Sequence, residues 1–487
     1  MKSSLPWHRF SMSMYALMVC LLAAPLLAAD SNVAPRPIPL TRPEMKELIE
    51  DMKARKPRIP LPELTAEEKE RLGERGAGYE GRLRSLYMPA SEGRGTGAGA
   101  GGGGRGTGGG FGNGFSGRDN NGEMTLDYRF KTMLFWIVSR TNNCQYCLGH
   151  QESKLLGAGM TEDEIAALDG DWLQFSPAER AAFAYARKLT YEPNRINDAD
   201  IDRLREFYRD LQILEMTLSV SGNNAINRWK EGVGVPQSSS GGGFGRRDAN
   251  GAVTEPPPAP VAHSYLTPTS EPFQKTVTKV APLTLDDQSG APTRTTVCRR
   301  PALEPREEAE KILNAAAQRK ARLPLVDESK ARELLGEETG NQPLPQWVRL
   351  LANFPTAGKS LIASWRSGED KGDLTPMLKA QVSWILARQD RAWYAAAQAR
   401  AKMRELGASE NQIYALDGDW QEFSAADQAL FNVAKKLAAT PVVLTDADVS
   451  KALELTGPRQ VVQLVSYVTQ RASFDRITEA AGLTAGQ

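Results

Sequence analysis

The amino-acid sequence predicts an all-α fold, built as two tandem helical domains with Gly/Pro-rich linkers. Apolar side chains recur at spacings of three and four, which is the period of a helix that is buried on one face. No stretch alternates between apolar and polar residues for long enough to form a sheet. The chain has 487 residues, of which 41% are hydrophobic, and this is enough for more than one core.

The two domains are predicted from an internal duplication. Residues 136–234 recur 248 positions later without an insertion or deletion. The clearest match is the segment Leu-Asp-Gly-Asp-Trp, which ends at Trp172 and again at Trp420. A weaker match, between residues 55–61 and residues 319–325, has an offset of 264. Self-similarity at a fixed spacing is the signature of repeated units, so we expect each copy to include a helical N-terminal extension.

Residues 1–29 match the three regions of a signal peptide. A basic start is followed by an apolar run from Met14 to Leu27 and by two alanines before Asp30. The run is shorter than the ~20 residues that a membrane-spanning helix needs, and it contains Pro25, so we expect cleavage rather than an anchor. The sequence therefore predicts an exported protein, periplasmic or extracellular.

The remaining boundaries follow from changes in composition. We expect a helical extension over residues 30–92, a Gly-rich insertion over 93–122 and the first folded domain over 123–236. Residues 237–301 are rich in Gly, Ser and Pro and are predicted to be a disordered linker, and residues 302–487 hold the second repeat. Glycine loses the most conformational entropy on ordering, so the Gly-rich segments are not expected to fold alone.

Three helices of the first domain are predicted from their caps and apolar stripes. Ser176, followed by Pro and then by Glu179, begins one helix with a capping box. Asn197 caps a second helix, in which Ile201 begins the apolar stripe. A third helix is expected over residues 212–225, bounded by a Gly-Asn-Asn segment.

Charge and cysteine content narrow the function. The 60 basic and 59 acidic residues nearly cancel, so no net field would recruit nucleic acid or, after signal cleavage, a membrane surface. Cleavage would leave Cys144, Cys147 and Cys298, which are too few for a disulfide scaffold in a chain of this size. One close pair and a leftover cysteine indicate redox chemistry; Cys298 is interpreted either as a free thiol or as an intermolecular partner.

Cys144 and Cys147 form a CxxC motif at a predicted helix start, where Asn142 or Asn143 would be the N-cap. The positive end of a helix favours a thiolate over a thiol. Residues three apart lie about 60° apart around a helix, so the two sulfurs can form and break a disulfide with little backbone movement. The motif is therefore typical of thiol redox chemistry.

Three other interpretations of the motif are a zinc site, a c-type haem site and an inert structural disulfide. A zinc site needs more ligands, and only His150 and His263 remain outside the signal peptide, so no metal is expected. A c-type haem site needs His directly after the second cysteine, where this chain has Leu148. An inert structural disulfide in an oxidising compartment stays open as the alternative.

The segment Asn-Cys-x-Tyr-Cys-x-x-His is followed by Gly-Met-Thr-x-x-Glu-Ile, a Phe-Ser helix start and an Asn-x-x-Asn-Arg end. Together these motifs resemble the carboxymuconolactone decarboxylase and alkylhydroperoxidase D superfamily. The resemblance covers about residues 126–236, with a degenerate copy that reaches Gly482. It implies two alkylhydroperoxidase D-like helical domains and peroxiredoxin-type reduction of hydroperoxides, with no bound cofactor and an external, unidentified thiol as electron donor.

The resemblance also implies roles for individual residues. Cys147 would attack the peroxide and Cys144 would resolve the product, whereas the helix dipole by itself favours Cys144 as the thiolate. The family's relay histidine would stand at Gln151, one position after His150, which is the candidate here. The family's glutamate would stand at Thr132. Two carboxylates are candidate substitutes, although each is better interpreted as a helix-surface or cap residue: Glu152 and Glu215.

The second repeat lacks the site. The candidate residues of the first copy correspond to Ala392, Ala395 and Gln398, so the second copy cannot perform thiol chemistry. We expect it to serve as a partner for the first copy, in an intramolecular pseudo-dimer or within a homo-oligomer. Arg228 recurs as Arg476, and we interpret both as members of structural ion pairs.

Two further function classes stay open beside the dithiol enzyme. A carboxymuconolactone decarboxylase-type lactone enzyme would use a histidine and a carboxylate and would not need the thiols. A noncatalytic envelope protein would use the CxxC motif as a closed structural disulfide, with the Gly-rich and Pro-rich segments for assembly.

Overall fold

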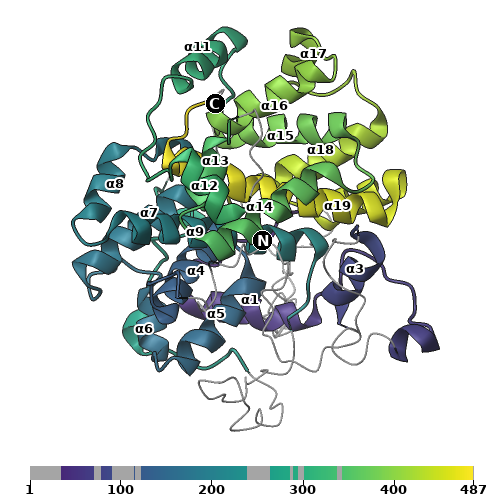
Figure 1. Ribbon diagram of the computed structural model, residues 1–487. Coiled ribbons are helices and arrows are strands. Elements are labelled where there is room, and N and C mark those ends of the chain that lie inside the picture. The colour runs from purple at the N-terminus through teal and green to yellow at the C-terminus, as the bar shows by residue number, and fades with distance from the viewer. Residues whose placement is uncertain are drawn as a thin grey trace, which may run out of the picture.

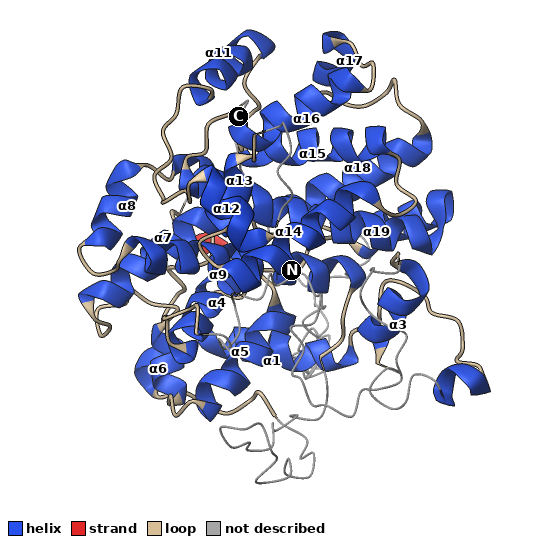
Figure 2. Ribbon diagram, in the orientation of Figure 1, coloured by secondary structure: helices blue, strands red, loops and turns tan. Residues whose placement is uncertain are grey.

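The computed structural model describes residues 34–70, 78–89, 115, 122–237, 264–285, 289–293, 301–336 and 343–485. Over this part of the chain the fold is all-α, as predicted, and Figure 2 shows how completely helices fill the molecule. The strands found there are two-residue segments, β1 (Thr284–Leu285) and β2 (Pro292–Thr293), which pair antiparallel. The predicted signal peptide, His263, Cys298 and nearly all of the Gly-rich insertion lie outside the described residues.

Figure 1 shows the first half of the chain in the lower part of the molecule and the second half in the upper part. The first half contains α1 (Arg42–Asp51), η1 (Met52–Ala54), α3 (Tyr79–Tyr87), α4 (Tyr128–Asn142), α5 (Gln145–Gly157), α6 (Glu162–Ala167), α7 (Pro177–Tyr191), η2 (Pro193–Arg195), α8 (Asp198–Arg205) and α9 (Asp210–Val233).

The short α10 (Glu271–Gln274) precedes the second half. The second half contains α11 (Arg306–Ala316), α12 (Glu328–Leu335), α13 (Gln346–Leu351), α14 (Pro355–Asp370), α15 (Pro376–Asp390), α16 (Trp393–Glu405), α17 (Glu410–Ala415), α18 (Ala425–Ala438) and α19 (Asp446–Ala481). None of the helices within the described residues combines the length and the apolar character that crossing a membrane requires.

The predicted caps of α7 and α8 are present, but the predicted end of α9 is wrong. Ser176 and Asn197 each form a capping box. The third helix continues past Ala225 to Val233, because the Asn224 side chain is hydrogen-bonded inside the protein. The Asn224 side chain donates to Thr190 Oγ1 over 3.0 Å and to a backbone carbonyl one turn earlier. A buried amide with such partners does not compete with the helix backbone.

Helices of the two halves correspond in position along the chain. The bounds of α4, α5 and α6 differ from those of α15, α16 and α17 by 248, the offset found in the sequence. The residues after α9 and α19, Gly234 and Gly482, both adopt left-handed backbone conformations with φ of 70° and 63°. Asn143 and Arg391, which follow α4 and α15, do the same. The two-repeat interpretation accounts for all of these pairs.

The long helices α9 and α19 pack against each other at the centre of the molecule, where the halves meet (Figure 1). Arg228 on α9 donates to the carbonyl of Ala438 at the end of α18, over 2.9 Å. Arg476 on α19 donates to the carbonyl of Thr190 at the end of α7, also over 2.9 Å. Each member of one contact is matched in the other at the 248 offset, which is the reciprocity of a two-fold interface.

The structural ion pair that we expected at both arginines is found at Arg476, which pairs with the buried Asp390 over 2.9 Å. At Arg228 the hydrogen bonds go to the side-chain oxygens of Asn224 and Asn142 and to Thr440 Oγ1. The reason lies in the sequence, because Asn142 stands at the position that Asp390 occupies in the second half.

Part of the stretch that was predicted as a disordered linker packs against the first half. Tyr265 and Val280 are buried, with exposed fractions of 4% and 0%. The backbone N–H of Thr278 donates to the carbonyl of Leu40, and that of Lys279 donates to the carbonyl of Asp169. Residues 264–281 thus form a strap over α1, α6 and α7, with apolar side chains and backbone hydrogen bonds that a composition-based prediction does not detect.

We predict that Arg476→Leu lowers the free energy of unfolding by about 3–5 kcal/mol, since it takes the guanidinium away from a carboxylate that is 0% exposed. Urea unfolding followed by circular dichroism would measure the loss. Arg203→Ala, on an arginine whose side chain is 57% exposed, is the control and should cost less than about 0.5 kcal/mol. Equal effects of the two substitutions would contradict the role given to the buried pair.

Candidate active site

The two cysteines lie at the junction of α4 and α5. Asn143 ends α4 in a left-handed conformation, and Cys144 itself is the N-cap of α5. The prediction that Asn142 or Asn143 caps this helix is therefore wrong. A single left-handed residue reverses the chain so sharply that the N–H of Cys144 still donates to the carbonyl of Ser139 in α4, over 2.9 Å. The Asn143 side chain instead donates to the carbonyls of Arg36 and Pro37.

The thiols of Cys144 and Cys147 lie side by side, and both are free. Cys147 is in the first turn of α5, so the spacing of the CxxC motif brings the sulfurs to one face of the helix start, as predicted. Both side chains are buried, with exposed fractions of 0% and 2%. The structure thus assembles the predicted dithiol, but it places it beneath the surface.

Sequence analysis missed a carboxylate at this site. Glu231, in the last turn of α9, lies close enough to the Cys144 thiol for each group to shift the pKa of the other. It recurs in the sequence as Glu479, and this was the available signal. The signal was not decisive, because residues such as Arg228 also recur 248 positions later and have structural hydrogen bonds.

Three arginines from the N-terminal extension surround Glu231. Its Oε2 atom lies 3.5 Å from Arg36 Nη1 and 3.2 Å from Arg55 Nη2, and Arg58 Nη1 donates to its backbone carbonyl. Burial would raise the pKa of Glu231, but the guanidinium groups of Arg36, Arg55 and Arg58 outweigh burial and lower the pKa to about 2. Glu231 is therefore a carboxylate at physiological pH.

The Cys144 thiol is held in its protonated form. Burial raises the pKa of Cys144 well above its ordinary range, and the Cys147 thiol and the negative charge of Glu231 raise this pKa further. The expectation that the helix dipole makes Cys144 a thiolate is therefore wrong for this structure. A partial charge at the helix end does not compensate for full desolvation beside a carboxylate.

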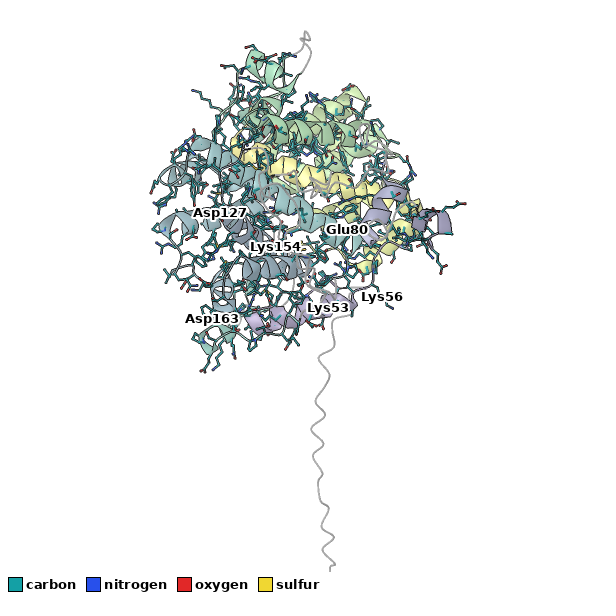
Figure 3. The ribbon with its side chains drawn as sticks, turned by 60° about the horizontal axis from the view of Figure 1, so that its bottom comes forward. Lys53, Lys56, Glu80, Asp127, Lys154 and Asp163 are labelled. Carbon is teal, nitrogen blue, oxygen red and sulfur yellow. The ribbon has the colours of Figure 1, made fainter. Side chains whose placement is uncertain are left out.

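His150 lies one turn further along α5. Its ring packs edge-on against Tyr146, with ring centroids 4.7 Å apart. Burial, together with the charges of Lys230 and Lys154, lowers the pKa of His150 to about 4, so the imidazole is neutral at physiological pH. In the described part of the chain no hydrogen bond joins it to either thiol. Lys154 and Glu80, whose charges act on His150, are labelled in Figure 3.

Neither of the two candidate substitute carboxylates reaches the thiols. Glu152 is buried rather than on the helix surface, and it pairs with Arg42 over 2.7 Å and with Lys46 over 3.1 Å. Glu215 caps backbone N–H groups before α4, as the cap interpretation expected, and it pairs with Lys131. Two positions of the family motif are likewise structural here: the Thr132 hydroxyl donates within α4, and Gln151 is buried.

The second half keeps the carboxylate without the thiols. Ala392 and Ala395 stand at the cysteine positions, both fully buried. Gln398, at the position of the histidine, donates to Tyr394 Oη over 3.1 Å. Glu479 accepts from the backbone N–H of Tyr394 and from Arg319. The carboxylate that faces a thiol in the first half therefore faces the start of helix α16 in the second.

The elements that cover α5 pack closely on Gly149. A Cβ atom at this position would lie 2.8 Å from Ile49 Cγ2 of α1, 2.8 Å from Gln237 Nε2 and 3.2 Å from Tyr265 Cζ. Glycine is thus required where the N-terminal extension and the strap meet the helix that carries the dithiol.

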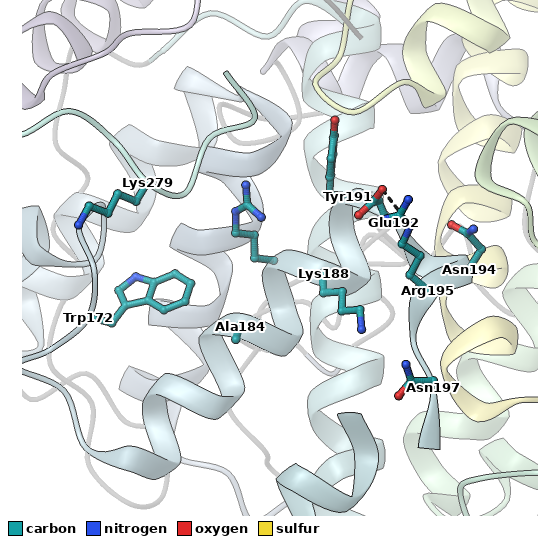
Figure 4. Close-up of a pocket in the computed structure, with 10 residues that line it drawn as sticks. Trp172, Ala184, Lys188, Tyr191, Glu192, Asn194, Arg195, Asn197 and Lys279 are labelled. Atoms are coloured by element: carbon teal, nitrogen blue, oxygen red, sulfur yellow. Dashed lines mark ion pairs between the residues drawn. The ribbon is translucent and has the colours of Figure 1, made fainter. Parts of the chain in front are cut away.

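An open cavity lies apart from the dithiol. Figure 4 shows this cavity of about 900 Å³, lined by Trp172, residues of α7 and η2, and Lys279. Two of its cations are already paired, Lys188 with Asp200 over 2.7 Å and Arg195 with Glu192 over 3.3 Å. Neither cysteine lines it, so the volume of this cavity says nothing about the dithiol.

We predict that His150 makes stability depend on pH. Its pKa in the folded state is depressed to about 4, so the unfolded state binds a proton first when the pH falls. The contribution of the neutral imidazole to the free energy of unfolding is complete above about pH 6.5 and is lost as the pH falls toward 4. Urea unfolding at pH 7.5 and 4.5 should therefore show a smaller loss, by about 2 kcal/mol, in His150→Gln than in the wild type. Identical losses in the two proteins would contradict the depressed pKa.

Comparison with known proteins identifies the segment that carries the dithiol. Residues 114–188 match the model of the Carboxymuconolactone decarboxylase family, and no curated protein matches the chain. The matched residues include α4, α5, α6 and most of α7, together with both cysteines. The part of the chain that carries the cysteine pair is thus similar to the carboxymuconolactone decarboxylase family.

Proposed function

We propose that the protein is a thiol-dependent oxidoreductase with peroxiredoxin-type activity, which reduces hydroperoxides with Cys144 and Cys147. The observation that supports this best is the pair of free thiols at the start of α5, with a carboxylate beside one of them. The superfamily match over the same helices gives independent support. We also propose that the protein is exported and that an external thiol returns the disulfide to the dithiol.

In the proposed cycle the sulfur of Cys147, as thiolate, attacks one oxygen of the hydroperoxide. The O–O bond breaks, an alcohol leaves after taking up a proton, and Cys147 becomes a sulfenic acid. The sulfur of Cys144 then attacks Cys147, loses its proton, and releases water as the disulfide forms. Two electrons pass from the two thiols to the peroxide, and an external dithiol restores them.

The environment of Cys144 supports this division of roles. A resolving cysteine acts only after the sulfenic acid has formed, and burial beside the Glu231 carboxylate keeps Cys144 as a thiol, which is less nucleophilic toward the peroxide than a thiolate. Cys147 is then the cysteine that attacks. His150 is neutral and able to accept a proton, but its pKa of about 4 makes it a weak base, so we propose it as an auxiliary proton acceptor.

Burial of the dithiol constrains the cycle. Exposed fractions of 0% and 2% leave no room for a bound peroxide beside Cys144 or Cys147 in this conformation. We therefore propose that the N-terminal extension or the strap moves away from α5 to admit the substrate and the reductant. The same burial is the one observation that favours the alternative, a closed structural disulfide in a noncatalytic envelope protein.

We predict that Cys147→Ser reduces peroxide consumption to the level of the variant lacking both cysteines. Cys144→Ser should consume about one equivalent of peroxide per chain and then stop, because the sulfenic acid is not resolved. A coupled assay with cumene hydroperoxide and dithiothreitol measures the turnover of the wild type. The single equivalent consumed by Cys144→Ser is measured after dithiothreitol has been removed, because an external thiol would reduce the sulfenic acid, and mass spectrometry identifies the oxidised residue. Cys298→Ser is the matched control and should turn over like the wild type.

Two outcomes would contradict the proposed enzyme. In the first, the double cysteine variant consumes peroxide as fast as the wild type. In the second, the disulfide resists mild reductant, and its removal lowers the melting temperature while no turnover is lost. The second result would support the structural disulfide.

A further inference from the structure

We propose that the second half of the chain tunes the dithiol through one ion pair, between Arg58 and Asp446, which acts on Cys144 by way of Glu231. Arg58 and Asp446 are positioning residues in this proposal, since neither touches the thiols. The inference rests on the proposed function, because it gives the emptied repeat a task at the redox site. Its test reads the thiol directly, without peroxide.

Arg58 joins the two halves at the edge of the site. Its Nε donates to Asp446 Oδ1 over 2.5 Å and its Nη2 donates to the carbonyl of Leu444 over 3.0 Å, both in the second half. Its Nη1 donates to the carbonyl of Glu231 in the first half. The side chain is only 3% exposed. A planar guanidinium with donors in a fixed fork transmits the position of one partner to the other.

The backbone around Arg58 is also fixed against α9. Its N–H donates to the carbonyl of Val233 over 3.2 Å. The neighbouring Gly234 has φ of 70°, and a Cβ atom there would lie 2.9 Å from the Arg58 nitrogen. This close approach leaves little freedom for the segment that holds Arg55, whose guanidinium contacts the Glu231 carboxylate and interacts with Cys144.

The charges give the direction of the effect. Several ionisable groups lie around Cys144. From other elements these are the Glu231 carboxylate and the three arginines around it, Arg36, Arg55 and Arg58. From α5 itself they are Cys147 and Tyr146. With Asp446 included, three cations face two carboxylates, so the cluster carries one positive charge. Loss of the Cys144 proton would neutralise it. Removing a negative charge should favour the thiolate, and removing a cation should disfavour it.

The molecule contains a matched control for this ion pair. In the second half Arg322 Nε donates to Asp198 Oδ1 over 2.8 Å, and its Nη1 donates to the carbonyl of Glu479, also over 2.8 Å. This contact crosses between the halves in the opposite direction, but it leads to Ala392 instead of a thiol. Asp198→Asn and Arg322→Gln therefore break the same kind of contact without a cysteine at its end.

The experiment is a pH titration of thiolate ultraviolet absorbance in the full-length chain with Cys147→Ser. The signal of an otherwise identical chain that also carries Cys144→Ser is subtracted, so that only Cys144 contributes. Asp446→Asn should lower the titration midpoint by about half a unit to one unit, a three- to tenfold gain in thiolate at fixed pH. Arg58→Gln should raise the midpoint by a similar amount.

Glu231→Gln should lower the midpoint more than Asp446→Asn does, since it removes the negative charge nearest the sulfur. The two control variants should shift it by less than about 0.2 unit. Melting temperatures of all variants show whether each is folded, and Arg58→Lys, which keeps the charge, replaces Arg58→Gln if that variant is not folded; its midpoint should stay near that of the parent chain.

Shifts of Asp446→Asn and Arg58→Gln in the same direction would overturn the proposal, because they would mean that both substitutions merely loosen the site. Equal shifts in the control variants, or no shift in any of the four, would overturn it as well. None of these results depends on turnover, so the peroxidase proposal stands or fails separately, on peroxide consumption.

Discussion

The Glu231 carboxylate is buried near the end of α9, between the Cys144 thiol on one side and the guanidinium groups of Arg36, Arg55 and Arg58 on the other. A carboxylate taken out of water is stable only when cations and hydrogen-bond donors compensate for its lost hydration. The N-terminal extension supplies all three cations, so it must fold over α9 and α5. The burial of the dithiol follows from that constraint, since the same extension covers it.

The second half also buries a carboxylate among arginines, but it has no thiol beside it. Glu479 is buried with Arg319 and Arg322 around it, although Ala392 stands where the first half has a thiol. The buried carboxylate with its arginines is thus a structural feature that both halves share. In the first half a cysteine stands beside it, and the charge of Glu231 adds to the effect of burial in raising the pKa of Cys144.

Burial and the helix dipole act on Cys144 in opposite directions, and their magnitudes decide the outcome. A helix terminus contributes typically 0.3–1 kcal/mol, up to about 2 in partly buried sites, whereas burying a charge without compensation costs several kcal/mol. The nearby Glu231 carboxylate adds repulsion. Cys144 therefore remains a thiol although it caps a helix, in agreement with the resolving role proposed for it.

The sequence by itself determined the helical class, the caps at Ser176 and Asn197, and the closeness of the Cys144 and Cys147 side chains. Each of these features depends on residues within one or two helical turns. Only the tertiary structure decided that Glu231, 87 positions after Cys144, meets its thiol, and that the thiols are buried. Such contacts depend on how whole helices and the N-terminal extension pack, and local spacing carries no record of that packing.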